Sequence, residues 1–568
     1  MQALRILRAA VDAGHRDPYD PAVPLILTAG PLTGAAAPGT ARVLAIGLSP
    51  LSGGVAETRA EGPFGAALVG AGADTLVLTG RAEVPSYVVV RDGIATLHDA
   101  RHLWGLGTGA VTDALADEYG AAAGVAVIGP AGERGARYAS VVTARHFPLP
   151  RLGFGALFGA RNLKAVVCLG AAVPPVADPA ALAALADGYA AEQATNPLTA
   201  WQHDAPGFGV WPGTVTDPGY GASRNYSDTT ALPGPGLAPG RFVARLSTGG
   251  GCPACPTDCV KVFTAPGGAA AGLHQEAVAA LGPNLGVDDA DTVLAANARC
   301  QDLGLDPVSL GGTLGCLYEA AEAGLTPDDW SVSGFGTDPL PLIEETATGT
   351  GELAELLRGG AARLAAALGA PHLAMTVRGV ELPPFEPRVQ PGLALAYAIA
   401  PTGPRYDAVE HDLDFDPDEG KPHSYPELRR LGLAVPEPAQ RLDTARAERT
   451  ATLMCLWSAL DALAICPYAS TPTRPLGVDR IVALVRAVTG RAVTVDGLLA
   501  LGAARLRAQH GINLRLGLGP DAGRLPDRMH TEPVATGRYA GAVLDRAAFT
   551  AALGVLAGRL ALITTNEE

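Results

Sequence analysis

The spacing of hydrophobic positions changes near residue 178. Before that point short apolar runs recur between glycine and proline turns, which predicts β-strands at 25–28, 43–47, 75–78, 87–90, 125–128 and 165–168. After it, apolar residues recur at helical spacing, which predicts helices at 180–192, 276–281, 290–303, 310–323, 352–368, 444–465, 478–488 and 495–509. We therefore expect an α+β, multidomain fold, with a β-rich N-terminal domain followed by two mainly α-helical domains.

Three domains agree with the length of 568 residues, since one domain usually takes about 150 residues. A Gly/Pro-rich connection at 207–239 and an extended, proline-rich stretch at 382–388 interrupt the helical part. We place the domains at 1–177, 178–375 and 376–568.

Composition narrows the class of protein. With 48% hydrophobic and 17% charged residues the chain is globular, and a formal charge of −15 argues against binding to nucleic acid. No apolar stretch approaches the ~20 residues that span a bilayer, and the N-terminus lacks the apolar core of a signal peptide. Eight cysteines in so long a chain do not indicate a disulfide framework, so we expect a protein of the reducing cytoplasm.

A glycine-rich segment, Arg151-Leu-Gly-Phe-Gly-Ala-Leu-Phe-Gly159, loosely matches a dinucleotide-binding fingerprint. Such a fingerprint follows a strand, and here Pro148 and Pro150 occupy the place of that strand. We therefore expect no Rossmann fold.

The strongest chemical signal is Cys252-Pro-Ala-Cys255-Pro-Thr-Asp-Cys259, called the tri-cysteine loop below. Proline cannot continue a helix, so the segment should form a loop that brings its thiols together. Three clustered thiolates plus a distant fourth are the ligands of a [4Fe–4S] cluster. The alternatives are a structural zinc site, although no second ligand pair is visible, or reactive loop thiols.

Among the other cysteines we favour Cys466 as the fourth ligand. It directly precedes Pro467 at the end of a predicted helix, where a thiol can turn towards a ligand. Cys168 and Cys316 lie in apolar runs typical of a core, and Cys300 and Cys455 lie within helical patterns.

In this order along the chain, several short motifs resemble those of the tungsten- or molybdenum-containing aldehyde ferredoxin oxidoreductases. The resemblance runs from about residue 19 to about residue 545. Besides the tri-cysteine loop, it includes Ala29-Gly-Pro-Leu-Thr-Gly34, Ser49-Pro-Leu-Ser-Gly53, Ile128-Gly-Pro-Ala-Gly-Glu133, Gly159-Ala-Arg-Asn-Leu-Lys164, Leu281-Gly-Pro-Asn-Leu-Gly286 and Asn513-Leu-Arg-Leu-Gly517.

The resemblance implies an enzyme that oxidises an aldehyde to a carboxylic acid and passes electrons through a [4Fe–4S] cluster to ferredoxin or a similar one-electron carrier. It also implies a tungsten (or molybdenum) bis-pterin cofactor seated on the β-rich domain, with magnesium as a candidate ion between the pterin phosphates. It leaves the oligomeric state open, a homo-oligomer included.

Site residues follow from the resemblance position by position. It implies that Cys466 joins the tri-cysteine loop as a cluster ligand and that Glu276 is the active-site general base, although a first-turn helix carboxylate is a purely structural alternative. The positions that it assigns to pterin binding are Arg42, Arg151, Leu305, Asp306, Asp461 and Ile465.

Several positions depart from the family pattern. Gln301 replaces an aspartate and Ala464 a glycine of the two pterin motifs, and Arg59 replaces an asparagine near the bridging metal. Tyr406 stands where the family has its active-site histidine, and His411 is either its replacement or a solvated loop residue.

These departures keep two other functions open. One is the same cofactor set acting on a non-aldehyde substrate. The other is a pterin-free iron–sulfur electron-transfer subunit. The chain also begins some way into the family's first domain.

Overall fold

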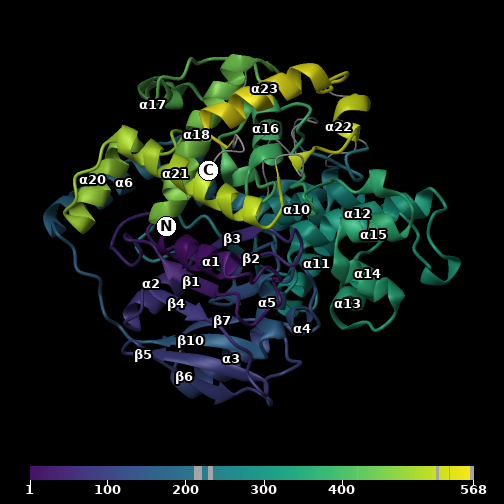
Figure 1. Ribbon diagram of the computed structural model, residues 1–568, viewed down its shortest axis with the longest axis horizontal. Helices are drawn as coiled ribbons and strands as arrows, with labels where there is room; N and C mark the ends of the chain where they lie inside the picture. Colours follow the sequence, from purple (N-terminus) through teal and green to yellow (C-terminus); the bar gives the residue numbers. More distant parts are fainter. Residues whose placement is uncertain (210–220, 228–233, 419, 520–522, 536–537, 563–568) are drawn as a thin grey trace.

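The computed structural model describes residues 1–209, 221–227, 234–418, 420–519, 523–535 and 538–562. Two sheets form its N-terminal part, at the bottom of Figure 1. The first is antiparallel, in the order β3-β2-β1-β4. Its strands are β1 (Leu25–Ala29), β2 (Val43–Leu48), β3 (Val55–Ala60) and β4 (Thr75–Leu78). Helix α1 (Gln2–Asp12) packs its apolar face on this sheet through Leu4 and Leu7.

The second sheet has the order β6-β5-β10-β7-β8-β9, and β5 and β10 are its parallel pair. The strands are β5 (Ser86–Arg91), β6 (Ile94–Asp99), β7 (Gly124–Val127), β8 (Val141–Thr143), β9 (Phe147–Leu149) and β10 (Leu163–Leu169). The helices of this region are α2 (Phe64–Gly70), α3 (Thr108–Tyr119), α4 (Pro130–Glu133) and α5 (Phe154–Ala160).

The expectation that the prolines near residue 149 exclude a strand is wrong. Strand β9 contains Pro148, at the edge of the second sheet. An edge position tolerates proline because one side of the strand needs no N–H donor. The largely antiparallel pairing of both sheets still differs from a Rossmann fold.

Helices dominate the next part of the chain; α10 to α15 lie at the right of Figure 1, whereas α6 lies at the left. They are α6 (Pro179–Gln193), α7 (Pro197–His203), α9 (Pro239–Val243), α10 (Gln275–Leu281), α11 (Ala290–Leu303), α12 (Pro307–Glu322), α13 (Leu340–Thr348), α14 (Glu352–Gly359) and α15 (Ala361–Ala367). A small sheet carries the tri-cysteine loop between its first two strands; its members are β11 (Leu246–Gly249), β12 (Lys261–Thr264) and β13 (Ala270–Leu273). Most of the predicted 207–239 connection lies outside the described residues.

The single helix predicted at 352–368 is wrong, because α14 and α15 are separate. Gly360 divides them with a φ of +86°, which side chains rarely adopt, and a Cβ there would lie 2.8 Å from Leu51 Cδ1.

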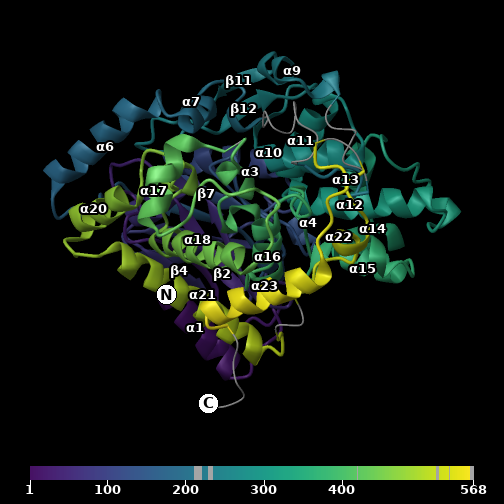
Figure 2. The same cartoon turned by 90° about the horizontal axis from the view of Figure 1, so that it is seen from above.

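The C-terminal part is built around α18 (Thr444–Leu463) and α21 (Val495–Arg515), which lie side by side above the first sheet in Figures 1 and 2. At their crossing a Cβ on Gly502 would lie 1.7 Å from the Cys455 carbonyl oxygen. The other elements are β14 (Thr376–Val377), β15 (Val380–Glu381), α16 (Pro391–Ile399), η6 (Tyr406–Ala408), α17 (Tyr425–Arg430), α19 (Pro467–Ser470), α20 (Val478–Thr489), α22 (Arg528–Thr531) and α23 (Arg546–Arg559).

The expected α+β fold class is confirmed: a β-rich N-terminal region precedes mainly helical chain. The three domain boundaries stay a prediction. One apolar core joins both N-terminal sheets to helices α10–α15, and a second fills the C-terminal helices. Within the described part of the chain, no helix combines the length and apolarity needed to cross a membrane.

Candidate functional site

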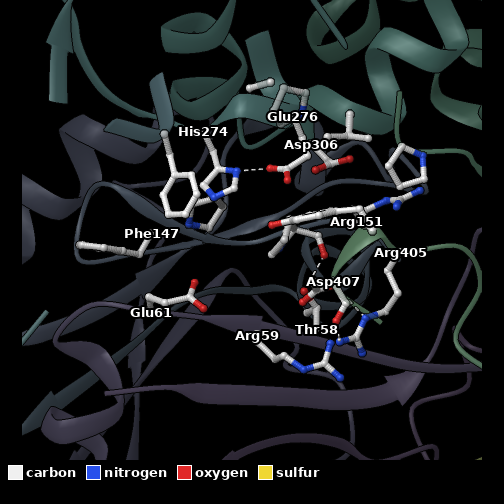
Figure 3. Close-up of a pocket in the computed structure, with 18 of the residues that line it drawn as sticks. Thr58, Arg59, Glu61, Phe147, Arg151, His274, Glu276, Asp306, Arg405 and Asp407 are labelled. Carbon is white, nitrogen blue, oxygen red and sulfur yellow. Dashed lines mark hydrogen bonds and ion pairs between the residues drawn. The ribbon is translucent and has the colours of Figure 1, made fainter. Parts of the chain in front are cut away.

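A cavity of about 220 Å³ lies where the N-terminal sheets meet the two helical regions (Figure 3). Thr58 and Arg59 reach it from β3, Arg151 from the loop after β9, Glu276 from α10 and Arg405 from the turn before η6. The site is therefore assembled from segments far apart in the sequence, and the tri-cysteine loop borders it through Cys259.

Glu276 and His274 form a buried pair on one wall of this cavity. His274 is the N-cap residue of α10, and its Nδ1 makes a short hydrogen bond with Glu276 Oε2 (Figure 3). Burial would lower the pKa of His274, but the Glu276 carboxylate raises it above the usual histidine value. His274 Nε2 and Glu276 Oε1 are buried without a hydrogen-bond partner. The pair can therefore exchange a proton with a ligand in the cavity.

Aromatic rings surround this pair. Phe208 stacks on His274 with 4.6 Å between ring centroids, and Tyr468 lies 5.4 Å away. Tyr406, which the resemblance places at the position of the family histidine, has its ring centroid 6.2 Å from that of His274 and stacks on Phe385. These rings exclude water from one side of the Glu276–His274 pair.

His411 lies in a neighbouring cavity of about 540 Å³ rather than in the first. Its Nδ1 lies 3.2 Å from Gln390 Oε1. Tyr406 lines both cavities, as do Phe208 and Tyr468. Of the two candidates, the structure thus places Tyr406 in the same cavity as Glu276 and His411 in the neighbouring one.

The four candidate cluster cysteines gather beside the first cavity. The tri-cysteine loop is non-helical, as expected, and Cys466 caps the short helix α19. Burial raises the pKa of Cys252 and Cys259, and repulsion from the Cys466 thiolate adds to both shifts, so the loop and Cys466 lie close together. The N-terminal region anchors both segments, because Gly62 N donates to Cys252 Sγ at 3.2 Å and Cys466 N donates to the Gly39 carbonyl at 2.9 Å.

Across the described ranges, no three His, Cys, Asp or Glu side chains are placed to hold a single metal ion. A [4Fe–4S] cluster makes a different demand, because each of its four thiolates binds a different iron.

Asp306 and Arg151 share the Glu276 side of the cavity. Asp306 is the N-cap of α12, where Oδ2 accepts from Ser309 N at 2.7 Å and Oδ1 has no partner. Arg151 donates from Nη1 to the Pro404 carbonyl at 2.7 Å and, over a short contact, from Nη2 to the Glu381 carbonyl, while its Nε is unpaired. Leu305 is buried and bridges to Ala139 instead of lining the cavity.

The opposite wall is a buried network of arginines and carboxylates. Asp461 Oδ2 accepts from Arg59 Nη2 at 2.7 Å and from Arg405 Nη1 at 3.1 Å, and Oδ1 accepts from Arg42 Nη1 at 3.4 Å. Arg42 Nη1 also donates to the Ile465 carbonyl at 3.4 Å. Burial would raise the pKa of Asp461, but the arginines around it hold that pKa below its usual range.

The sequence profile of "Aldehyde ferredoxin oxidoreductase, domains 2 & 3" matches residues 198–554, and that of the N-terminal domain matches residues 2–170. The chain belongs to the aldehyde ferredoxin oxidoreductase family. It is an oxidoreductase of that family, and the expected resemblance is confirmed.

The chain is similar to two proteins of Pyrococcus furiosus with different names. The tungsten-containing aldehyde ferredoxin oxidoreductase of Pyrococcus furiosus is 30% identical over 535 residues, which cover 92% of this chain and 85% of the relative. The WOR-like subunit of an aliphatic sulfonate oxidoreductase from the same organism is 26% identical over 326 residues, covering 54% of this chain and 51% of the relative.

A solved structure shares the fold. The active-site complex BamBC of benzoyl coenzyme A reductase, with 1,5-dienoyl-CoA, aligns with a TM-score of 0.82 at 18% identity, covering 97% of this chain and 89% of that chain.

The cavity fits a pterin on one wall only. Unpaired buried atoms of Asp306, Arg151, Glu276 and His274 face it from one side, and such atoms call for a polar ligand. On the other side the charged groups are engaged with one another. We call the first group (Arg151, His274, Glu276 and Asp306) the Glu276 wall.

Sequence reasoning missed His274 and Arg405, and it did not assign Tyr468 a role. His274 was detectable as a histidine two residues before the candidate base at a helix start. Arg405 has no comparable signal, because its carboxylate partner Asp461 lies 56 residues further along the chain.

Proposed function

We propose that this family member oxidises an aldehyde to a carboxylic acid and delivers the two electrons, one at a time, to ferredoxin or a similar one-electron carrier. The balanced reaction takes up water and releases two electrons and two protons. The observation that carries the proposal is the buried Glu276–His274 pair, which has an unpaired oxygen and nitrogen and lines a cavity bordered by the tri-cysteine loop.

Glu276 Oε1 acts as the general base. It takes a proton from the attacking water as the carbonyl carbon is hydrated, and its other oxygen is held by His274. His274 holds or moves that proton, because its Nδ1 contacts the carboxylate while Nε2 faces the cavity. Tyr406 and Tyr468 orient the substrate and exclude bulk water.

The residues that would hold the redox group are Arg151 and Asp306, through a phosphate and ring-edge hydrogen bonds respectively. A tungsten (or molybdenum) pterin bound there supplies the two-electron acceptor. Cys252, Cys255, Cys259 and Cys466 would hold a [4Fe–4S] cluster between this cavity and the exposed loop.

The test compares two glutamates that share a local setting. Glu276 and Glu352 both lie in the first turn of a helix, but Glu276 is 6% exposed and Glu352 is exposed. With protein purified anaerobically after growth with tungstate or molybdate, Glu276→Gln should lower aldehyde-dependent dye reduction by about 10²–10⁴-fold at unchanged metal content. Glu352→Gln should leave the rate unchanged. Full activity of Glu276→Gln would remove Glu276 from the mechanism.

A second candidate keeps the cofactors and changes the substrate. It is favoured by Tyr406 at the place of the family histidine, and by the match to a subunit named for aliphatic sulfonates. A metal-loaded protein that oxidises no member of an aldehyde panel would support it. Iron without tungsten, molybdenum or pterin would instead favour a pterin-free electron-transfer subunit.

A further inference from the structure

Asp461 does not reach the cavity that it is expected to serve. Arg42, Arg59 and Arg405 line the cavity, whereas Asp461 lies behind them and does not. Both of its oxygens are occupied: Oδ2 by Arg59 and Arg405, and Oδ1 by Arg42. Arg505 adds an ion pair at 3.7 Å. A pterin on this side would therefore have to displace guanidinium groups before it met the carboxylate.

The same network is electrically balanced. Arg42 contacts Glu61 at 2.6 Å, Arg405 contacts Asp407 at 2.8 Å, and Arg505 makes a short ion pair with Glu57. Four arginines thus face four carboxylates; we call this set of eight the Asp461 network (Arg42, Glu57, Arg59, Glu61, Arg405, Asp407, Asp461 and Arg505). Because the charges cancel, this wall offers a phosphate no net positive charge.

Partner counting distinguishes the two walls. The Glu276 wall keeps Asp306 Oδ1, Arg151 Nε, Glu276 Oε1 and His274 Nε2 without hydrogen bonds. In the Asp461 network, Arg59 Nε also lacks a hydrogen bond, but it lies 2.5 Å from Asp461 Oδ1 within an ion pair. A buried polar atom without a hydrogen-bond partner is destabilising, so the Glu276 wall is the one that a polar ligand would stabilise.

The position of the network limits the cavity on this side. Arg42, Arg59 and Arg405 line the cavity in front of Asp461. A second pterin there would require their ion pairs with Glu61, Asp461 and Asp407 to be broken.

We propose that this chain holds one pterin, against the Glu276 wall, and that the Asp461 network takes the place of a second. This inference rests on the proposed function for the presence of a metal–pterin group. It assigns Asp461 and Arg42 a structural role, and it removes the need for a cation bridging two phosphates, because only one phosphate is bound.

The direct experiment is stoichiometry, which needs no activity. The full chain is produced with tungstate or molybdate and purified anaerobically. Iron, tungsten, molybdenum and magnesium are measured by mass spectrometry, and the pterin is released by acid oxidation and quantified by fluorescence. We expect one pterin per tungsten or molybdenum and no stoichiometric magnesium.

Two pterins per metal would overturn the inference and leave the proposed function intact. Iron with neither pterin nor tungsten or molybdenum would overturn both. The two failures are therefore distinguishable.

Reciprocal variants test the assignment of the walls. Arg151→Gln should lose most of the pterin while iron per chain stays unchanged. Asp461→Asn should keep its pterin, counted per iron-containing chain. Exposed Arg430, whose side chain is 55% exposed, provides a control as Arg430→Gln with unchanged pterin and iron. Loss of pterin from Asp461→Asn together with its retention in Arg151→Gln would overturn the inference. If either variant fails to fold, the ratio of pterin to tungsten or molybdenum in the wild-type protein decides.

Discussion

Replacing Asp461 by asparagine tests whether this carboxylate supports the protein or a ligand. Its side chain is 4% exposed, and the arginines paired with it are between 3% and 15% exposed. Removing one partner from a buried ion-pair network costs about 3–5 kcal/mol, because the remaining charges stay buried without compensation. A cooperative unit of 150–250 residues loses about 2–4 °C in Tm per kcal/mol. We therefore expect Asp461→Asn to lower the Tm by roughly 6–20 °C.

The assay is thermal unfolding by circular dichroism, on protein produced without tungstate or molybdate. Asp479→Asn is the matched control: Asp479 pairs with Arg430, both side chains are about half exposed, and such pairs contribute about 0–1 kcal/mol. An Asp461→Asn Tm equal to that of Asp479→Asn would refute the structural role.

The same substitution makes a prediction about pH. The folded-state pKa of Asp461 is lowered, so its carboxylate contributes stability above the unfolded pKa of about 4 and loses it as the pH falls through the folded value. The difference in Tm between the parent and Asp461→Asn should therefore become smaller as the pH falls below about 4. A constant difference over that range would contradict the assigned pKa direction.

Three further predictions use separate measurements. In nitrogen NMR of labelled histidine, the pKa of His274 should lie above the usual value of about 6.5 in the parent. It should lie below that value in Glu276→Gln, because burial still lowers the pKa once the carboxylate charge is gone. The stability that the charged pair contributes is present below pH 6.5 and is lost as the pH rises through the folded-state pKa. Cys466→Ser should lower iron per chain and abolish the cluster signal in EPR, and an unchanged iron content would exclude Cys466 as a ligand. In denaturant unfolding, Gly502→Ala should lower the free energy of unfolding by about 1–3 kcal/mol, because the added methyl group clashes at the α18–α21 crossing. The control is Gly554→Ala on α23, where the added methyl group meets open space. It should be neutral or stabilising by up to about 1 kcal/mol.

Periodicity in the sequence predicted most elements because local pattern decides them. The helix predicted at 290–303 has the bounds of α11, and the N-cap of α12 is visible as Asp306 before Pro307. The candidate cluster cysteines were also local signals, since two loop spacings and one helix end single them out in the sequence.

Strand β3 could not be predicted in this way. Its sequence, Val55-Ala-Glu-Thr-Arg-Ala60, contains two charged residues that would normally face water, yet the whole strand is buried. Glu57 and Arg59 are stable there only because Asp461 and Arg505 arrive from helices 400 and more residues later in the chain. For the same reason the sequence did not predict that the arginines of one wall are paired with carboxylates, whereas the other wall keeps unpaired polar atoms. Without its distant partner, each arginine has the appearance of a phosphate ligand in the sequence.

The tri-cysteine loop faces outward while its distant partner faces inward. Pro253, Ala254 and Pro256 are exposed, whereas Cys466 is only 8% exposed. For the proposed cluster, the shortest path for electrons to the outside would run through the loop, because electron tunnelling slows steeply with every added ångström. A carrier protein would therefore have to contact this proline-rich loop. The shape of the loop surface, more than the chemistry of the cavity, would then decide which carriers can accept electrons from this enzyme.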